Sequence, residues 1–293
     1  MNILLTGSSG HVGNELKNYF LKKTNYNLFL PVRKIKSKNT NRIKFFLCDL
    51  EQSIRLKNKI DIVIHCASLD RHIRTNKSKV YKKNILMTKN IIKFSNKKRI
   101  SKIFFMSTMM VYKNLNKNKH LISEDDKFRL DFYAKSKIDS EKLLCSNKNY
   151  FKAICLRLPG VLTTSSQKGP LLKQITFRLI KNENIKLFNL KKKFNNLIDV
   201  QEIFTFISFV LKKKIISKVC HLAARNPMKL GDIIEFIKFS IKSKSKIISS
   251  GNNKKFFLIS TKIVQDEFGF KPSTTINILK RYCKNLIKLN VYN

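Results

Sequence analysis

The first half of the chain alternates between short apolar runs and longer amphipathic stretches. The apolar runs have the length of strands and lie at residues 2–6, 27–32, 43–47, 60–66, 103–106 and 151–156. Between them, apolar side chains recur at helical spacing over residues 12–23, 77–96 and 127–146. This alternation predicts βαβ units, and therefore a parallel sheet with helices on its faces.

The pattern is less regular in the second half of the chain. A strand-like run covers residues 219–222, and helical spacing covers residues 171–181, 200–211, 230–241, 260–268 and 274–289. The sequence has no internal repeat and no linker long enough to separate independent domains. We therefore expect an α/β fold with a doubly wound parallel sheet and a smaller C-terminal lobe.

A glycine-rich turn joins the first strand to the first helix. Its glycines have GxxGxxG spacing, although the whole chain has only eight glycines. The first permits a tight turn, the second lets backbone amides approach a pyrophosphate, and the third lets the helix pack closely on the sheet. The helix N-terminus adds N–H groups and the positive end of its dipole. We therefore predict a Rossmann-type dinucleotide site at Gly7, Ser9, Gly10, His11, Val12 and Gly13.

The residues after the second and third strands bear on the choice of cofactor. NAD sites usually place an acid after the second strand, but here Arg33 and Lys34 follow it, and these suit a 2′-phosphate. The alternative is a solvated basic surface in a lysine-rich chain. We expect NADP or NAD, with NADP favoured. Asp49 and Leu50 are expected at the adenine, although an Asp at a helix N-cap would look the same.

Tyr133 and Lys137 are four residues apart and therefore share one face of a helix. A tyrosine titrating near ~10 is a poor acid or base at neutral pH, but an adjacent ammonium group favours the phenolate and lowers its pKa. The lysine can also bind the ribose of a nicotinamide. The pair predicts an enzyme that moves a proton while the nicotinamide moves a hydride.

These segments together resemble the extended branch of the short-chain dehydrogenase/reductase superfamily, a group of NAD(P)-dependent sugar-nucleotide epimerases, dehydratases and reductases. The resemblance runs through most of the chain and includes residues 65–67, 84–90 with Asn84, 105–112, 157–160 and 194–200. It implies that Thr108 hydrogen-bonds the substrate oxygen beside Tyr133 and Lys137. It also implies further cofactor contacts at Cys66, Ala67, Ser107, Leu158 and Pro159.

Two departures from the family pattern narrow this expectation. Family 4,6-dehydratases carry an acidic pair after the signature threonine, where this chain has Met109 and Met110, which cannot transfer protons. The departure argues against a dehydratase. In the second lobe, Asp199 stands where His is common, and Gln201 and Glu202 replace an Asp pair.

The resemblance implies a 4-epimerase or a carbonyl reductase acting on a nucleotide sugar or similar hydroxy or keto compound. The alternative is a non-catalytic, NAD(P)-sensing regulator on the same fold. We expect an NAD(P)-binding domain over residues 1–158, which carries the Tyr–Lys helix, and an interleaved substrate-binding lobe over 159–293. Family members often dimerise through two long helices. The apolar residues that would favour such a homodimer are Val80, Met87, Ile91, Phe94, Ile138, Leu143 and Leu144.

Charge and cysteine content add weaker constraints. The formal net charge is +43, but the lysines are spread along the chain among many Asn and Ile residues, which fits biased codon usage better than a specific nucleic-acid site. The field would still attract an anionic substrate. The six cysteines form no CxxC motif, and we expect free thiols and no metal site. With neither a signal peptide nor a membrane-spanning run, we expect a cytoplasmic protein.

The three acidic residues at 124–126 could act as a catalytic carboxylate pair, but they have a simpler structural explanation. They precede the predicted helix that starts near Lys127, so we expect them to act as negative charge at its N-terminus.

Overall fold

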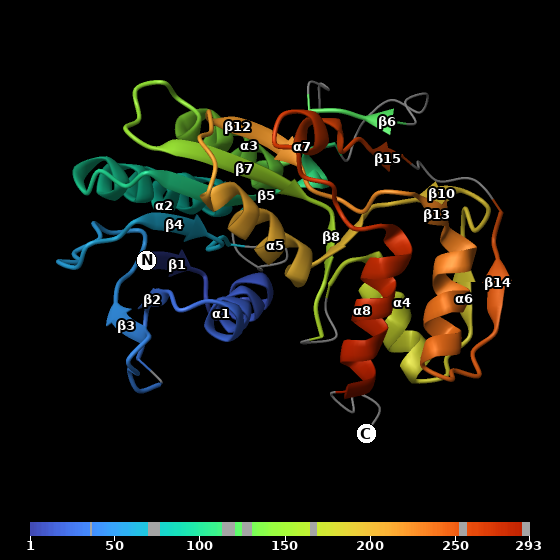
Figure 1. Cartoon of the computed structure of the whole chain (residues 1–293). Coiled ribbons are helices and arrows are strands. Elements are labelled where there is room, and N and C mark those ends of the chain that lie inside the picture. The colour runs from blue at the N-terminus through green and yellow to red at the C-terminus, as the bar shows by residue number, and fades with distance from the viewer. Residues whose placement is uncertain are drawn as a thin grey trace. The chain divides into compact units, whose positions relative to one another are not determined.

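The computed structural model describes residues 1–35, 37–69, 77–112, 121–124, 131–164, 169–251 and 257–288. The chain divides into two units (Figure 1). The first unit comprises Met1–Leu115, Lys127–Arg157 and Phe204–Cys220. The second comprises Asn116–Asp126, Leu158–Ile203 and His221–Asn293.

A seven-stranded parallel sheet forms the centre of the first unit. Its order is β12-β7-β5-β4-β1-β2-β3. The strands are β1 (Asn2–Thr6), β2 (Asn27–Val32), β3 (Ile43–Leu47), β4 (Ile62–His65), β5 (Lys102–Thr108), β7 (Lys152–Leu158) and β12 (Lys218–His221). The order reverses between β1 and β4, whose last residues Thr6 and His65 are paired. The predicted doubly wound α/β fold is therefore confirmed, and its switch point lies where such folds bind ligands.

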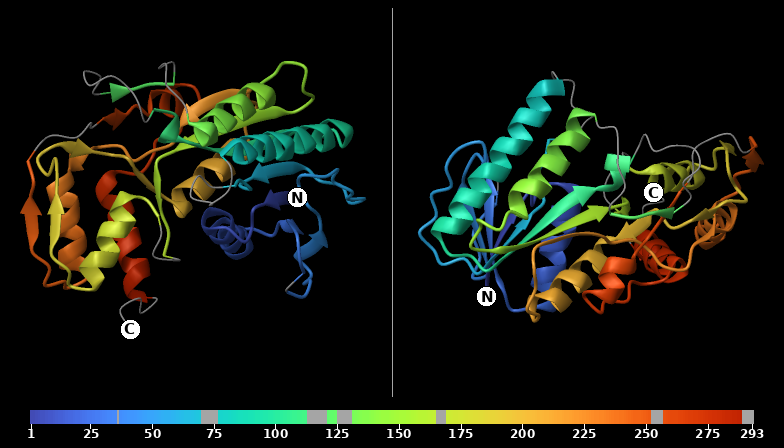
Figure 2. Two further views of the ribbon diagram at one scale, coloured as in Figure 1. Left: turned by 180° about the vertical axis from the view of Figure 1, so that it is seen from behind. Right: turned by 90° about the horizontal axis from the view of Figure 1, so that it is seen from above.

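Helices cover both faces of this sheet (Figure 2). α2 (Lys77–Lys97) and α3 (Phe132–Leu144) pack on each other over one face. α1 (His11–Lys23) lies on the other face with the part of α5 (Val200–Leu211) that starts at Phe204. The ring of Phe204 lies 5.0 Å from that of Phe20 and 5.7 Å from that of Tyr19, measured between centroids.

Basic side chains satisfy the carbonyl groups at two helix ends in the first unit. Arg42 donates to the carbonyls of Leu21, at 3.0 Å, and of Thr24, beyond the end of α1. Lys102 Nζ lies 2.7 Å from the carbonyl oxygens of both Leu211 and Lys213, at the end of α5. Burial lowers the pKa of Lys102. These contacts fulfil the usual role of cations at helix C-termini.

In its described residues, the second unit has helices and four short strand pairs. The pairs are β8 (Gly160–Leu162) with β11 (Leu197–Asp199), β9 (Ile185–Leu187) with β14 (Ile247–Ser249), β10 (Lys193–Phe194) with β13 (Met228–Lys229), and β6 (Leu121–Ile122) with β15 (Leu258–Ile259). Its helices include α4 (Leu171–Ile180), α6 (Leu230–Ser240), α7 (Lys262–Asp266) and α8 (Thr275–Lys288). Apolar side chains of α4, α6 and α8 form the core of the unit.

The acidic residues that depart from the family pattern have a structural role in this unit. Arg281 of α8 lies 2.6 Å from Asp199 Oδ2 through Nε and 2.9 Å from Glu202 Oε2 through Nη2. Glu202 Oε1 also accepts a hydrogen bond from the backbone of Ser273, at 2.8 Å. The two carboxylates therefore anchor α8 to the β11–α5 junction.

Two sequence-based expectations near the Tyr–Lys helix need correction. The helix expected from residue 127 begins at Phe132, and Asp131 is its N-cap, accepting a 2.8 Å hydrogen bond from the backbone of Ala134. Residues 127–130 lie outside the described part, as do Asp125 and Asp126. Glu124 Oε1 accepts a 2.7 Å hydrogen bond from the backbone of His221. Further along, the helix expected over 260–268 is confined to Lys262–Asp266.

Within the described ranges, the structure has no helix that combines the length and apolar character needed to cross a membrane.

Candidate active site

The first glycine of the turn after β1 is fixed by both backbone angle and space. Gly7 has φ +69°, in the left-handed region that favours glycine. A Cβ at this position would lie 2.6 Å from the backbone nitrogen of Ala67 and 2.8 Å from the carbonyl carbon of Cys66. The turn after β1 therefore lies directly against the backbone that follows β4. The predicted cofactor residues at these two strand ends are in contact.

The other two glycines of the turn have different surroundings. A Cβ on Gly13 would overlap the carbonyl oxygen of Gly7 and lie 2.8 Å from its carbonyl carbon, so α1 packs on the turn with no room for a side chain. A Cβ on Gly10 would lie 3.3 Å from the same oxygen, which requires only a small adjustment. The protein's own packing therefore requires glycine at 7 and 13 far more strictly than at 10.

The start of α1 is suited to bind an anion. Gly10 is its N-cap and no side chain caps the helix there, while the first turn contains no acidic residue. The first backbone N–H groups of a helix have no partner within the helix, and a phosphate can accept their hydrogen bonds. Ser9 and His11 are exposed beside this position, and Val12 is half-buried. These features and the glycine spacing fit the pyrophosphate of a dinucleotide.

A buried hydrogen bond joins the ends of β1 and β4. Thr6 Oγ1 lies 2.7 Å from His65 Nδ1 and also accepts a 3.2 Å hydrogen bond from the backbone of Ala67. Burial, with a smaller contribution from the charge of Lys137, lowers the pKa of His65 to about 3. Burial also raises the pKa of Cys66 to about 12. Both side chains are therefore neutral at physiological pH, and Cys66 is not a reactive thiolate.

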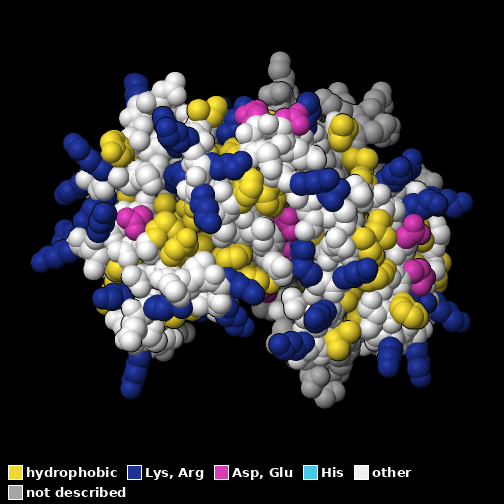
Figure 3. Space-filling view, in the orientation of Figure 1, with side chains coloured by type: hydrophobic (Ala, Val, Ile, Leu, Met, Phe, Trp, Pro, Cys, Tyr) yellow, Lys and Arg dark blue, Asp and Glu magenta, His cyan; other side chains and the backbone are white. Residues whose placement is uncertain are grey.

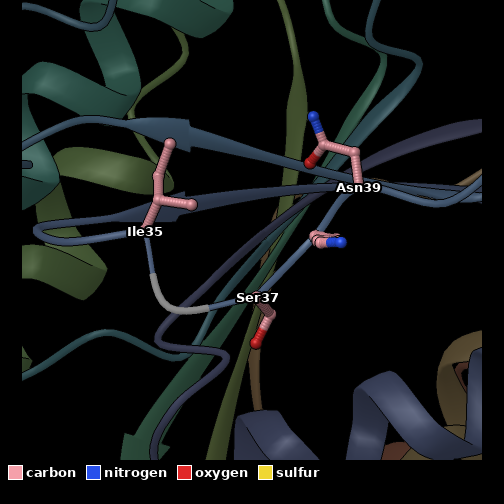
Figure 4. A pocket seen from close by; sticks show the side chains of 4 residues that line it. Ile35, Ser37 and Asn39 are labelled. Atoms are coloured by element: carbon pink, nitrogen blue, oxygen red, sulfur yellow. The ribbon is translucent and has the colours of Figure 1, made fainter.

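The carboxyl end of β2 carries the two cations that bear on cofactor choice. Arg33 and Lys34 are exposed directly after β2. The connection that follows encloses a shallow hollow of about 410 Å³, lined by Ile35, Ser37, Lys38 and Asn39 (Figure 4). The hollow is open to solvent and contains none of the predicted site residues.

Asp49 and Leu50 form a turn after β3. Asp49 Oδ1 accepts a 3.0 Å hydrogen bond from the backbone of Glu51, and no helix occurs in the described residues 50–69. The alternative explanation of Asp49 as a helix N-cap is therefore wrong. Leu50 is buried, and its carbonyl accepts a 2.9 Å hydrogen bond from Asn90 of α2.

Tyr133 and Lys137 lie on the face of α3 that packs against β5. Lys137 is buried, and its Nζ donates a 2.9 Å hydrogen bond to the carbonyl of Met106. The same nitrogen lies 4.7 Å from the ring centroid of Phe105 and 5.8 Å from that of Tyr133. Tyr133 is half-buried in the first turn of α3. The ammonium group of Lys137 therefore lies close to the phenol ring of Tyr133, whose pKa it is predicted to lower.

Thr108 is the last residue of β5 and is followed by the short 3₁₀ helix η1 (Met109–Tyr112). Its Oγ1 accepts a 3.1 Å hydrogen bond from the backbone of Met110. Because α3 packs against both β5 and η1, the structure places Thr108 beside the helix of Tyr133 and Lys137. The three predicted catalytic residues therefore lie on adjoining elements of the first unit.

The hydrogen bond of Ser107 identifies Glu141, a residue of the site that the sequence did not predict. The buried hydroxyl of Ser107 donates a 2.5 Å hydrogen bond to Glu141 Oε1, so this side chain is bound by the protein itself. Glu141 lies one turn after Lys137 on α3, and its Oε2 lies 2.8 Å from Arg157 Nη2 of β7. Burial acts to lower the pKa of Arg157, but the hydrogen bonds and charge of Glu141 outweigh it and raise that pKa. Arg157 is therefore charged across the physiological range.

The side chain of Asn84 joins two segments of the first unit. It accepts a 2.8 Å hydrogen bond from the backbone of Leu69 and donates one of 3.2 Å to the carbonyl of the same residue. It also donates a 3.1 Å hydrogen bond to Ser136, which neighbours Lys137 on α3. Asn84 therefore links the segment after β4 to the helix of the predicted catalytic pair.

The remaining predicted residues lie at the end of β7. Leu158 is the last residue of this strand and Pro159 follows it, and both are buried. In the described ranges, no group of three or more His, Cys, Asp or Glu side chains is arranged to hold a metal ion.

A comparison with protein families matches this chain to a known family. The model of the NAD dependent epimerase/dehydratase family matches residues 3–220. The chain belongs to this family. The match covers the glycine turn, Thr108 and the Tyr–Lys helix of this epimerase/dehydratase family member.

Similar proteins cover almost the whole chain. An uncharacterized protein of Methanocaldococcus jannaschii is 25% identical, over 96% of this chain and 95% of that protein. The structure of UDP-glucose 4-epimerase from Thermotoga maritima with UDP-glucose has a TM-score of 0.79 at 15% identity, covering 99% of this chain and 100% of that one. The structure of dTDP-glucose 4,6-dehydratase from Bacillus anthracis with NAD has a TM-score of 0.76 at 16% identity, covering 100% and 98%. These structural similarities show the shared fold and confirm the predicted Rossmann-type class.

Proposed function

We propose that this protein oxidises and reduces a carbon–oxygen centre of a nucleotide sugar with NAD(P), as a 4-epimerase or as a carbonyl reductase. The supporting observation is that Lys137, within 5.8 Å of the ring of Tyr133, stands on the helix that packs against the strand ending at Thr108. This constellation shares a unit with the glycine turn. A non-catalytic NAD(P) sensor would not need these three residues together.

Each residue has a distinct role in this proposal. Tyr133 exchanges a proton with the substrate oxygen, and Lys137 stabilises the phenolate and binds the nicotinamide ribose. Thr108 hydrogen-bonds the same substrate oxygen. When bound, the nicotinamide supplies or accepts the hydride. Met109 and Met110 cannot act as acids or bases, so we propose an epimerase or reductase rather than a dehydratase.

The proposed cofactor site follows the switch point of the sheet. The glycine turn and the start of α1 bind the pyrophosphate, with Gly7, Ser9, Gly10, His11, Val12 and Gly13. The turn at Asp49 and Leu50 binds the adenine. The nicotinamide half lies at Cys66, Ala67, Ser107, Leu158 and Pro159; Ser107 contributes its backbone, since its hydroxyl is bound to Glu141.

Arg33 supports a second candidate within this function, an NADPH-dependent reductase. Its exposed guanidinium after β2 is suited to a bidentate contact with a 2′-phosphate. An epimerase, by contrast, retains NAD through a keto intermediate. We propose NADP as the favoured cofactor, within a family described as NAD dependent.

Three broader proposals complete the assignment. Residues 1–158 form the cofactor-binding part, and residues 159–293 form the substrate-binding part interleaved with it. The protein acts as a homodimer. It resides in the cytoplasm, which its six free thiols support, because disulfides are rare in reducing compartments.

One experiment tests the reaction. Wild-type protein is assayed for epimerisation of UDP- and dTDP-hexoses and for NADPH or NADH oxidation with the corresponding 4-keto sugars. We expect Tyr133→Phe to lower kcat at least about 100-fold, as removal of an acid–base group typically does, while cofactor still binds. Tyr81→Phe is the matched control, since it removes a tyrosine hydroxyl of α2 that donates a 2.9 Å hydrogen bond to Asp139 of α3. Near-normal kcat in Tyr133→Phe would exclude the mechanism.

A binding titration tests the cofactor. We expect wild type to prefer NADP, and Arg33→Ala to weaken NADP binding by roughly 1.5–3 kcal/mol with little change for NAD. Lys44→Ala, an exposed change on β3, is the control. Preference of wild type for NAD would contradict the NADP proposal and favour the epimerase.

A further inference from the structure

A buried polar network connects α3 to both ends of the segment that contains Thr108. Glu141 and Arg157 form its centre, with side chains only 3% and 6% exposed. Arg157 donates to Glu141 through Nε, at 3.1 and 3.2 Å from the two carboxylate oxygens, and through Nη2 at 2.8 Å. Ser107 donates to Glu141, and Arg157 Nη1 donates to the hydroxyl of Tyr112.

The partners of this ion pair lie on either side of the predicted catalytic threonine. Ser107 immediately precedes Thr108, and Tyr112 ends the 3₁₀ helix that follows it. Lys137 binds the carbonyl of Met106 from the same face of α3, at 2.9 Å. Residues 106 and 107 of β5 are therefore bound by two consecutive turns of the helix, and residue 112 is bound through Arg157.

Stability alone gives a poor account of a buried ion pair. Removing two charges from water is costly, and apolar residues of similar volume often fill such a site with equal or greater stability. What apolar residues cannot do is fix several hydrogen-bond directions at once. The Arg157 guanidinium contacts a carboxylate and a phenol together, a geometry that only a planar, multi-donor group provides.

We propose that Glu141 and Arg157 are positioning residues that fix Thr108 relative to Tyr133 by binding Ser107 and Tyr112 on either side of it. This proposal rests on the proposed function, because it concerns the geometry of that reaction. The pair contributes to turnover rather than to substrate affinity, since both side chains are buried and bind other protein groups. Its loss lets the 107–112 segment shift while the glycine turn stays unchanged.

The test uses full-length protein with NAD(P) bound and three variants. The double variant Glu141→Leu/Arg157→Met removes both charges together, so no buried charge is left unpaired. Tyr112→Phe removes only one hydroxyl and keeps the ion pair. Asp139→Asn is the matched control, because it neutralises a carboxylate on the same helix that binds the exposed Lys135 at 2.8 Å.

Two measurements are made on each folded variant: steady-state kinetics, and backbone hydrogen exchange of residues 106–112. A misplacement of about 1 Å can cost about 100-fold in rate. We therefore expect kcat to fall about 100-fold in the double variant and about 10-fold in Tyr112→Phe, with KM and cofactor affinity within about threefold of wild type. Exchange over 106–112 should accelerate in both variants and stay unchanged in Asp139→Asn.

The outcomes separate this proposal from the proposed function. Unchanged kcat in a folded double variant, or unchanged exchange over 106–112, would overturn the positioning role. If the double variant does not fold, Tyr112→Phe decides, and its unchanged kcat and exchange would overturn the role equally. If wild type acts on no nucleotide sugar, the proposed reaction fails by itself, and the exchange measurement still decides whether the pair fixes the segment.

Discussion

The buried imidazole of His65 is neutral at the junction of β1 and β4. It hydrogen-bonds Thr6 at 2.7 Å and stacks on Phe105, with ring centroids 5.5 Å apart. Its pKa of about 3 lies far below the ~6.5 of an unfolded chain. A proton on His65 would therefore be unfavourable at the place where the glycine turn contacts the end of β4.

This shift predicts that acid destabilises the protein. Between pH values of about 6.5 and 3 the unfolded chain binds a proton at this residue that the folded chain excludes. The free energy of unfolding should therefore fall as pH decreases, by at most about 1.4 kcal/mol per pH unit from this residue alone. Denaturant unfolding between about pH 7 and 5, where few carboxylates titrate, measures the slope.

His65→Asn provides the comparison for that slope. The variant should be less stable at pH 7 but should lose less stability on going to pH 5, because it has no imidazole to protonate. Equal slopes in wild type and variant would show that His65 is not the excluded proton site. His72, which lies outside the described residues, offers a control substitution at a second imidazole.

Single residues also show what sequence could predict. The four-residue spacing of Tyr133 and Lys137 predicted their shared helix face, and continuing it by one turn reaches Glu141. Its partners could not be deduced in this way. Arg157 contacts Glu141, and Tyr112 contacts Arg157, only because the fold brings β7 and η1 to α3, which local spacing does not encode.

At the scale of elements, the strand–turn–helix unit at the N-terminus separates packing from ligand binding. Gly13 has no room for a Cβ because of the backbone of Gly7, whereas Gly10 has nearly enough. We expect Gly13→Ala to lower the free energy of unfolding by about 1–3 kcal/mol, as overpacking does, or to prevent folding. We expect Gly10→Ala to fold with less than about 1 kcal/mol lost.

Cofactor binding should depend strongly on Gly10, although protein stability does not. A methyl group at Gly10 would occupy the approach to the first amides of α1, so we expect at least about tenfold weaker NAD(P) binding in the folded Gly10→Ala protein. Titration of cofactor fluorescence and denaturant unfolding of both variants measure the two effects. If Gly10→Ala bound cofactor normally, the pyrophosphate would not lie at this turn.

The predicted strands agree with the structure where the run of apolar residues is long, at five or six residues. The first three strands have the predicted bounds, because apolar residues predominate in each, although β3 also contains the exposed Lys44. The short strands of the second unit were not predicted: β8, β10 and β13 contain two or three residues. Such strands exist through partners distant in sequence, as Lys193 with Lys229, and have no periodicity of their own.

At the scale of the whole molecule, the dominant property is the net charge of +43. On the face drawn in Figure 3, Lys and Arg side chains are spread over the surface of each unit, and Asp and Glu side chains are few. This distribution agrees with a broad field that attracts anionic ligands such as nucleotide sugars. Some cations also serve locally, as Lys102 does at the end of α5.

Repulsion between two protomers of charge +43 opposes the proposed homodimer. The structure also weakens the case for an interface on the two long helices. Of the apolar residues that suggested an interface on the long helices, most are already buried within the protomer: Val80, Met87, Ile91, Phe94, Ile138 and Leu144. Their pattern is explained by the core of the first unit. The large apolar side chains left exposed on α2 and α3 are Leu86, 42% exposed, and Phe132, 47% exposed.

We predict a homodimer that tightens as salt rises, because screening reduces the repulsion between two protomers of charge +43. Light scattering from about 0.05 to about 1 M salt measures it, since the Debye length falls to about 3 Å over that range. Leu86→Glu should weaken the dimer, whereas Ile216→Glu, the same kind of change at a residue 67% exposed outside these helices, should not. A monomer at every ionic strength would exclude the dimer, and equal effects of both variants would exclude α2 from its interface.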